Sequence, residues 1–219
     1  MTFGGTLSLE DLSLPRESIY AAMGYGDVLP DDGVRDLTET VLGQVLPLAR
    51  PQYVYRIVPA SVVDRYSILM DGVTFRVGNI IGSYLEGMTE ACVFVTSAGR
   101  AFDAYLQRVK GEGDILKEFV ADAVGSCVAE ACVDEIGRQL PSPHSLPYSP
   151  GYCAWNIREQ RLLFPLLPEQ PCGVTLGESC LMHPVKSVSG FFALGEHLVP
   201  QPYRCELCTN QGCYKKRHP

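Results

Sequence analysis

The sequence predicts an α+β fold in which a helical N-terminal unit packs on a twisted, mainly antiparallel sheet with one long central helix. Apolar residues recur every three or four positions from Val34 to Leu46, which predicts an amphipathic helix. The pair Asp71-Gly72 lies between two apolar runs, which predicts a β-hairpin. Asp114 can cap a helix that continues to about Leu140. The 219 residues, 46% of them apolar, suffice for a sizeable core.

Residues 1–52 are expected to form the N-terminal helical unit. Ser13 precedes Leu14-Pro15 and is expected to cap a helix that ends at Met23, where Gly24 and Gly26 stop it. A second helix is expected to begin at the cap residues Asp31 and Asp32 and to end near Pro51. Its apolar face would pack on the rest of the domain.

Residues 53–200 are expected to form the core domain, which begins with β-structure. The expected strands and turns follow in order: a strand from Tyr53 to Val58, hairpin strands 66–70 and 73–77, a short helix near Ile80 to Leu85, and a buried strand Ala91 to Val95. The last strand ends in a turn at residues 96–99.

The central helix follows a break at Gly111-Glu112-Gly113. A helix from Asp114 to Leu140 would span ~39 Å at 1.5 Å per residue. Gly125 lies inside it, at a cost of about 1 kcal/mol in helix propensity, and would let another element approach closely.

The chain beyond the central helix alternates turns with short elements. Pro150 and Gly151 predict a sharp turn after Ser149 that would present its backbone to a ligand. A helix is expected from Asn156, its cap, to Phe164, and a half-buried strand over residues 187–194. Gly190 would mark a bulge or a close approach in that strand.

The stretch from Tyr148 to Gly195 reads YSPGYCAW, then REQRLLFPLLP, then GVTLGESCLMHPVKSVSGFFALG. It resembles the activation domain of cobalamin-dependent methionine synthase, which has a Gly-Tyr turn, a helix and loop, a Glu-Ser segment, a proline and a Ser-Val-Ser-Gly strand in this order. The resemblance implies the C-shaped fold of that family. It also implies binding of S-adenosylmethionine and docking on a separate corrinoid-binding protein or methyltransferase subunit. Cobalamin on that partner would be reduced by a flavodoxin-type donor and remethylated.

The resemblance also implies candidate binding residues. The turn that contacts the adenosyl ligand matches Gly151, Tyr152 and Ala154, and the segment begins at Tyr148; Glu178 matches the glutamate of the Glu-Ser segment. From the residues alone, a turn without a ligand is the commoner structure, because turns outnumber binding sites.

A further candidate, Glu130, lies eight residues after Asp122, so both carboxylates lie near one helix face. In the family the matching glutamate is close to the ligand, whereas from the residues alone both are solvated charges. The sequence departs from the family at Pro147, where the turn normally has an arginine that can bind the methionyl carboxylate. Lys186 is interpreted as an exposed lysine at a strand start, although it could contact an anion.

The methionine synthase modules for homocysteine, folate and cobalamin are not among these residues, so the chain is expected to be a free-standing accessory domain that acts on another polypeptide. Any catalysis would then belong to the partner. The alternative is a corrinoid-protein binding or scaffold module, without enzymatic activity, that uses a metal-bearing tail.

The tail, residues 201–219, contains Cys205, Cys208, Cys213 and His218. Their spacing is compatible with tetrahedral zinc, and the three cysteines alone could hold an iron-sulfur cluster with one open position. A tail with reduced thiols and no metal is the alternative.

Charge and cysteine usage limit the other function classes. A net charge of −7 argues against a large nucleic-acid surface. No apolar run approaches the roughly 20 residues of a membrane span, and the N-terminus lacks a secretory signal, so we expect a cytoplasmic protein. Nine cysteines without such a signal indicate mostly reduced thiols. Those expected in the core are Cys92, Cys127, Cys132, Cys172 and Cys180.

Overall fold

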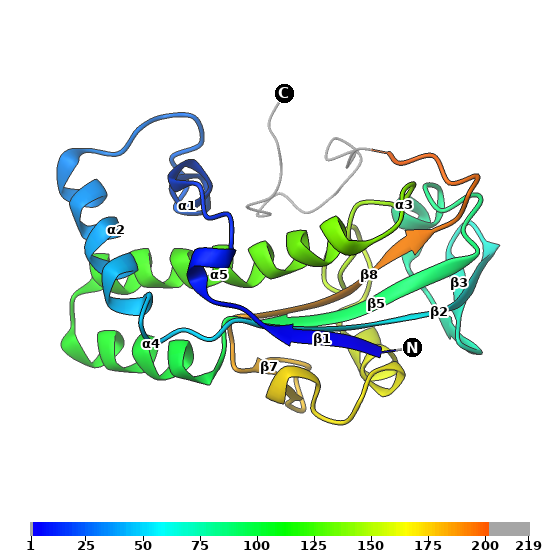
Figure 1. Cartoon of the computed structure of the whole chain (residues 1–219). Coiled ribbons are helices and arrows are strands. Elements are labelled where there is room, and N and C mark those ends of the chain that lie inside the picture. Colours follow the sequence, from blue (N-terminus) through cyan, green and yellow to red (C-terminus); the bar gives the residue numbers. More distant parts are fainter. Residues whose placement is uncertain (1, 202–219) are drawn as a thin grey trace.

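The computed structural model describes residues 2–201 and has the predicted α+β architecture. Its main sheet has six strands in the order β4-β3-β2-β5-β8, with β1 paired to β2, and every pairing is antiparallel. A long helix, α5, crosses one face of the sheet, and the segment containing β7 lies on the other (Figure 1). The strands are β1 Thr2–Thr6, β2 Gln52–Asp64, β3 Ser67–Met70, β4 Val73–Phe75, β5 Glu90–Ser97, β8 Ser187–Leu194, and the separate pair β6 Thr175–Leu176 and β7 Met182–His183.

The N-terminal helices pack against α5 at one end of the molecule (Figure 1). Asp31 caps α2 as predicted, because its carboxylate accepts the amide hydrogen of Val34. The predicted Ser13 cap is wrong: Pro15 precedes the first helix and provides no side-chain cap. Ser8 instead caps a preceding 3₁₀ turn. The elements of this part are the 3₁₀ turn Leu9–Asp11, α1 Arg16–Ala22 and α2 Asp32–Val45, so α2 ends earlier than predicted.

Strand β1 was not predicted, and β2 is longer than predicted. We expected β2 to end at Val58, before Pro59, but the strand continues because it changes partner there. Pro59 pairs with Glu90 of β5, and Ala60 pairs with Met70 of β3. The hairpin of β3 and β4 turns at Asp71-Gly72 as predicted, where both residues have positive φ, 48° and 82°.

Helix α5 (Ile115–Gln139) is the predicted central helix, and Asp114 caps it by accepting the amide hydrogen of Lys117. A Cβ on Gly125 would lie 2.5 Å from the Phe102 ring of α4 (Arg100–Glu112), so this glycine permits the close helix contact. Thr96 of β5 donates a hydrogen bond to the carbonyl of Ala129 at 2.9 Å. The helix is therefore fixed to both α4 and the sheet.

The remaining helical turns cover the sheet's other face. They are α3 Gly78–Gly82, a 3₁₀ turn Ile157–Glu159, α6 Gln160–Leu163, and 3₁₀ turns Phe164–Leu166 and Pro171–Gly173. Asn156 caps the first of the C-terminal turns, as predicted. Trp155 is buried against Phe75 and Phe191. Of the five cysteines expected in the core, Cys92, Cys132 and Cys180 are buried, whereas Cys127 and Cys172 are partly buried.

The edge strand β8 is in close contact with the segment before the Gly151 turn. Tyr148 and Phe191 exchange two backbone hydrogen bonds of 2.9 Å. A Cβ on Gly190 would lie 2.2 Å from the Tyr148 carbonyl oxygen, so the predicted close approach at this glycine is confirmed.

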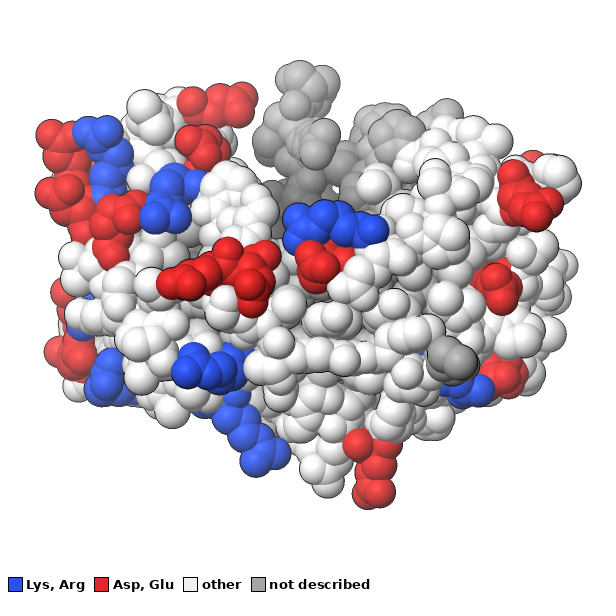
Figure 2. Space-filling model, viewed as in Figure 1, with Lys and Arg blue, Asp and Glu red and all other residues white. Residues whose placement is uncertain are grey.

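Charged residues of both signs gather over the helical end, near α1 and α2, and the face shown in Figure 2 has no continuous basic surface. Within residues 2–201, no helix is long and apolar enough to cross a membrane.

We expect Gly190→Ala to lower the free energy of unfolding by about 1–3 kcal/mol, the usual cost of overpacking, because the new methyl group meets a backbone carbonyl. Urea denaturation followed by circular dichroism measures this. Gly43→Ala is the control: Gly43 lies inside α2 with nothing within 4 Å of an added Cβ, so this change should stabilise the protein by up to about 1 kcal/mol. Equal stability of Gly190→Ala and the wild type would contradict the close approach.

Candidate functional site

A cavity of about 540 Å³ lies along the edge strand β8, and we call it the β8-edge cavity. It is bounded by α5, the turn after Tyr148, the start of α6, and the segment that contains β7. The lining residues are Ser126, Ala129, Glu130, Ser149, Pro150, Tyr152, Ile157, Gln160, Ser179, Cys180, Leu181, Met182, Val185, Lys186, Ser187, Val188 and Ser189.

Three consecutive residues of β8, Ser187, Val188 and Ser189, line the cavity. Successive residues of a strand point to opposite faces of the sheet, so the cavity reaches both faces at this edge. Val188 packs against the core cluster that contains Val133 and Ile136 of α5. Phe191, on the other face, belongs to the cluster that contains Leu163 of α6. Ser189 has the same parity as Phe191 and therefore faces the α6 side. The lining thus has an α5 side and an α6 side.

The α5 side contains the charged groups. The Lys186 ammonium lies 2.7 Å from an Asp122 carboxylate oxygen and donates to the Ser126 hydroxyl at 3.0 Å. Only 11% of the Lys186 side chain is exposed, so the interpretation as an exposed lysine is wrong. Ser126 lies midway between Asp122 and Glu130 and lines the cavity with Glu130. The predicted common face of the two carboxylates is therefore confirmed.

The turn between the two sides has the predicted sharp geometry. Tyr152 donates its amide hydrogen to the Ser149 carbonyl at 3.2 Å, and Gly151 has a φ of 98°. The Gly151 amide donates to the Trp155 carbonyl at 2.8 Å, so this amide holds the turn together. Ser149, Pro150 and Tyr152 contribute the lining instead.

The α6 side contains two buried polar groups that the sequence reasoning missed. Gln160 is 3% exposed and Ser189 is 1% exposed. The Gln160 side-chain oxygen and the Ser189 hydroxyl have no hydrogen-bond partner within the described part of the chain. Neither residue was selected as a site candidate, because Gln160 resembles any polar residue of a short helix and Ser189 was noted only as part of the half-buried Ser-Val-Ser-Gly strand.

The structure brings Glu130 and Tyr152 together on the lining, with Gly151 beside them in the turn. The remaining candidates do not line the cavity. Tyr148 is buried with its ring tilted by 43° against that of Phe191, and burial raises the pKa of its hydroxyl. Ala154 lies beside Gly78, with its carbonyl close to that glycine.

The last candidate, Glu178, has a carbonyl that accepts a hydrogen bond from Arg161, and its neighbour Ser179 lines the cavity.

The proposed metal ligands Cys205, Cys208, Cys213 and His218 lie outside the described residues. Within residues 2–201, no group of three or more His, Cys, Asp or Glu side chains is arranged to hold a metal ion.

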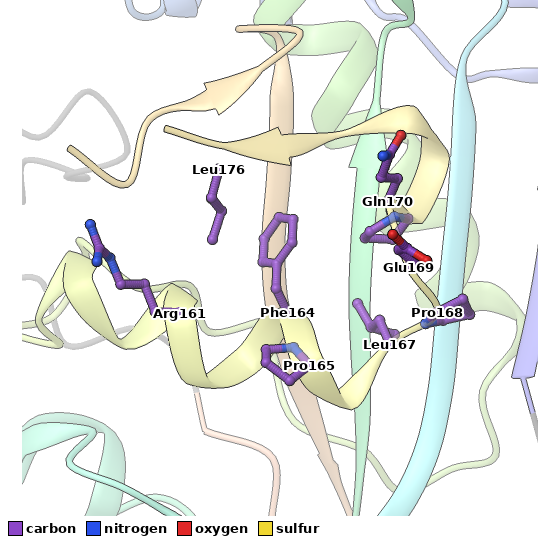
Figure 3. Close-up of a pocket in the computed structure, with 9 residues that line it drawn as sticks. Arg161, Phe164, Pro165, Leu167, Pro168, Glu169, Gln170 and Leu176 are labelled. Carbon is purple, nitrogen blue, oxygen red and sulfur yellow. The ribbon is translucent and has the colours of Figure 1, made fainter. Parts of the chain in front are cut away.

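A second hollow, of about 500 Å³, lies beyond α6 and has a mostly apolar lining of Phe164, Leu167 and Leu176 (Figure 3). Arg161 lies at its edge, but the guanidinium donates to the Glu178 carbonyl and, at 3.3 Å, to the Cys180 sulfur. None of the candidate site residues lines this hollow, so it does not compete with the β8-edge cavity as the site.

Cys127 lies beside the cavity and responds to its charges. Burial raises the pKa of this thiol to about 11, with a further increase from Glu130 and a decrease from Lys186. Its sulfur also lies 3.6 Å from the Ser18 carbonyl oxygen, as a weak hydrogen bond to α1.

The fold and the cavity define a class: α+β domains with a ligand-sized cavity at the edge strand of an antiparallel sheet that carries a long helix. The family model described as "Vitamin B12 dependent methionine synthase, activation domain" matches residues 144–217, a range that includes β8 and the cavity-lining residues from Ser149 to Ser189 but not Glu130 of α5.

Comparison of whole structures agrees with this match. The "Crystal Structure of the MetH Reactivation Domain bound to AdoHcy" is similar with a TM-score of 0.72 at 15% identity, over 93% of this chain and 80% of that chain. Among curated proteins nothing matches. The two positive comparisons confirm the resemblance to the methionine synthase activation domain, and the structural one confirms the fold class.

We expect Glu130→Gln to speed alkylation of Cys127 by iodoacetamide at pH 9, and Lys186→Met to slow it. Removing the negative charge lowers the thiol pKa and removing the positive charge raises it. Peptide mass spectrometry of the folded protein measures the rates. Cys92 is the internal control, because burial alone raises the pKa of its thiol. Unchanged Cys127 rates in both variants would show that these charges lie too far away to act.

Proposed function

We propose that this domain binds S-adenosylmethionine in the β8-edge cavity and serves the reductive reactivation of a separate corrinoid protein. The observation that carries the proposal is that Glu130, Tyr152 and the Gly151 turn, selected from the sequence, meet at one cavity. The neighbour of known structure, which has the same fold, is bound to AdoHcy, the demethylated form of the ligand.

The cavity suits this ligand in size and polarity. Its volume of about 540 Å³ lies within the roughly 300–1,000 Å³ of small-molecule sites. The Glu130 carboxylate can accept hydrogen bonds from a ribose diol or an ammonium group. Lys186 supplies a cation on the lining and is the group we assign to the methionyl carboxylate, in place of the family arginine that Pro147 replaces. Its pairing with Asp122 holds the ammonium in position.

The residues of the domain would bind and orient, and the ligands would supply the chemistry. Bound S-adenosylmethionine would supply the methyl group for the corrinoid of the partner, and a flavodoxin-type donor would supply the electron. Glu130, Tyr152 and Lys186 would hold the ligand in place for that transfer. A protein nucleophile is not required, so the contribution of this domain is proximity and electrostatic complementarity. We also propose that the domain acts in the cytoplasm with its partner, as expected from the sequence.

One observation favours a second candidate function. Because Pro147 provides no anion-binding side chain, a module that docks on a corrinoid protein without binding S-adenosylmethionine remains the competing proposal. Zinc or an iron-sulfur cluster at Cys205, Cys208, Cys213 and His218 would belong to this function. Elemental analysis of anaerobically purified protein, beside a Cys205→Ser variant, distinguishes a metal-bearing tail from a tail of free thiols.

We expect calorimetric titration to show binding of S-adenosylmethionine in the micromolar range and Gly151→Val to weaken it at least about tenfold. A β-branched residue is strained at a φ of 98° by about 1–3 kcal/mol, and the added Cβ would lie 3.3 Å from Ile157 on the lining.

The matched control for this titration is Gly24→Val. Gly24 has a φ of 91° and open space around it, so the variant carries the same backbone strain away from the cavity and should bind normally. Failure of the folded wild type to bind would contradict the adenosyl site and favour the docking module.

A further inference from the structure

We infer that Gln160 and Ser189 form an adenine-recognition subsite in the β8-edge cavity, in which the Gln160 side-chain oxygen accepts a hydrogen bond from the 6-amino group. The inference rests on the proposed function. It adds to that function the residues that recognise the adenine base of the ligand. Neither residue is among the candidates that the sequence or the family resemblance suggested.

The first argument is burial without a partner. Proteins pair nearly all of their buried polar groups, because an unpaired one destabilises the fold. Here the Gln160 oxygen and the Ser189 hydroxyl are both buried and without a partner within residues 2–201, and both residues line the same cavity. They come from different elements, α6 and β8, so a ligand that lies between them can pair with both.

The second argument is the separation of charge within the cavity. Lys186 and Glu130 lie on the α5 side of β8, whereas Ser189 faces the α6 side with Gln160. The lining residues beside Gln160 and Ser189 are uncharged and include Ile157. The Arg161 guanidinium is not on the lining, because it donates to the Cys180 sulfur and the Glu178 carbonyl. An ammonium would be desolvated there without a counter-charge, which is costly. A flat heterocycle with a neutral amino group meets no such penalty.

The third argument is the donor and acceptor pattern. An amide side chain is the usual partner of adenine, because it can accept from the 6-amino group and donate to a ring nitrogen. The Ser189 hydroxyl can donate to another ring nitrogen or accept from the amino group. The two side chains therefore match the polar edge of adenine, and the charged groups are left for the amino-acid end of the ligand.

The test compares two ligands by calorimetry: S-adenosylhomocysteine and its analogue without the 6-amino group. The wild type should bind the analogue about tenfold more weakly or worse, because the Gln160 oxygen would stay buried and unpaired. In Gln160→Met, which keeps the length of the side chain and removes the acceptor, the two ligands should bind equally. Ser189→Ala should weaken binding of S-adenosylhomocysteine several-fold.

The control variant is Ser187→Ala. Ser187 lies on the same strand and lines the same cavity, but its hydroxyl already donates to the Pro184 carbonyl and lies 3.0 Å from the Ser97 hydroxyl. This variant should keep the wild-type preference between the two ligands. Thermal unfolding without ligand gives an independent measurement: Gln160→Met should melt at the same temperature as the wild type or higher, whereas a purely structural glutamine predicts a lower one.

The outcomes separate this inference from the proposed function. A wild type that binds S-adenosylhomocysteine and the analogue equally would overturn the adenine subsite and leave the cavity as the binding site. A preference that survives in Gln160→Met would also overturn it. A folded wild type that binds neither ligand would overturn the adenosyl site itself, and the subsite with it.

Discussion

The backbone pairing of residues 144–148 with β8 is the constraint on which the site depends. Strand β8 is the last strand of the main sheet, and its outer edge would otherwise expose unpaired backbone groups. The Ser145 amide donates to the Ala193 carbonyl, the Ser145 hydroxyl accepts from the Ala193 amide, and Tyr148 forms its pair of backbone bonds with Phe191. The edge is thereby covered by a segment of the same domain. The turn that follows Tyr148 is held at the end of this pairing, where the edge becomes open again and the cavity begins.

Helix α5 provides the second fixed wall. Gly125 permits Phe102 and the aliphatic stem of Lys186 to lie against the helix backbone, since a Cβ there would meet both within 3 Å. Lys186 precedes β8 directly, so its ion pair with Asp122 joins the start of the edge strand to the helix. A half-exposed surface pair contributes little to stability, but this lysine is largely buried and also bonds to Ser126. The lining therefore has a fixed positive charge. The Lys186 ammonium that carries this charge is enclosed, whereas its partner Asp122 is exposed to solvent.

Local signals predicted those parts of the fold that depend on local chemistry. Asp31 and Asp114 cap their helices, and Asp71-Gly72 forms its hairpin, because each acts on the backbone within three residues. Strand β1 was missed because it is stabilised by pairing with β2, whose partner residues lie 46 to 54 positions further along the chain. The extension of β2 past Pro59 was missed because it depends on a change of partner.

The same distinction applies to the site. The family motif located the turn and Glu130, whereas the burial of Gln160 and the ion pair of Lys186 arise only when distant elements meet. A sequence records that a residue is polar; it does not record that folding leaves the group unpaired beside a cavity.

This distinction also bears on the departure at Pro147. A proline between Ser145 and Tyr148 costs the pairing with β8 nothing, because the bonds to β8 are made by the residues on either side of it. Proline at this position is therefore compatible with the pairing at the edge of the sheet. The fold does not require a cationic side chain there. Under the proposed function, the proline removes a charge for the ligand, and Lys186, at the start of β8 on the α5 side of the cavity, would take its place. A compact ammonium replaces a planar guanidinium there, so it would hold a carboxylate as a point charge without the two parallel bonds of an arginine. More of the specificity would then fall to the neutral groups on the α6 side.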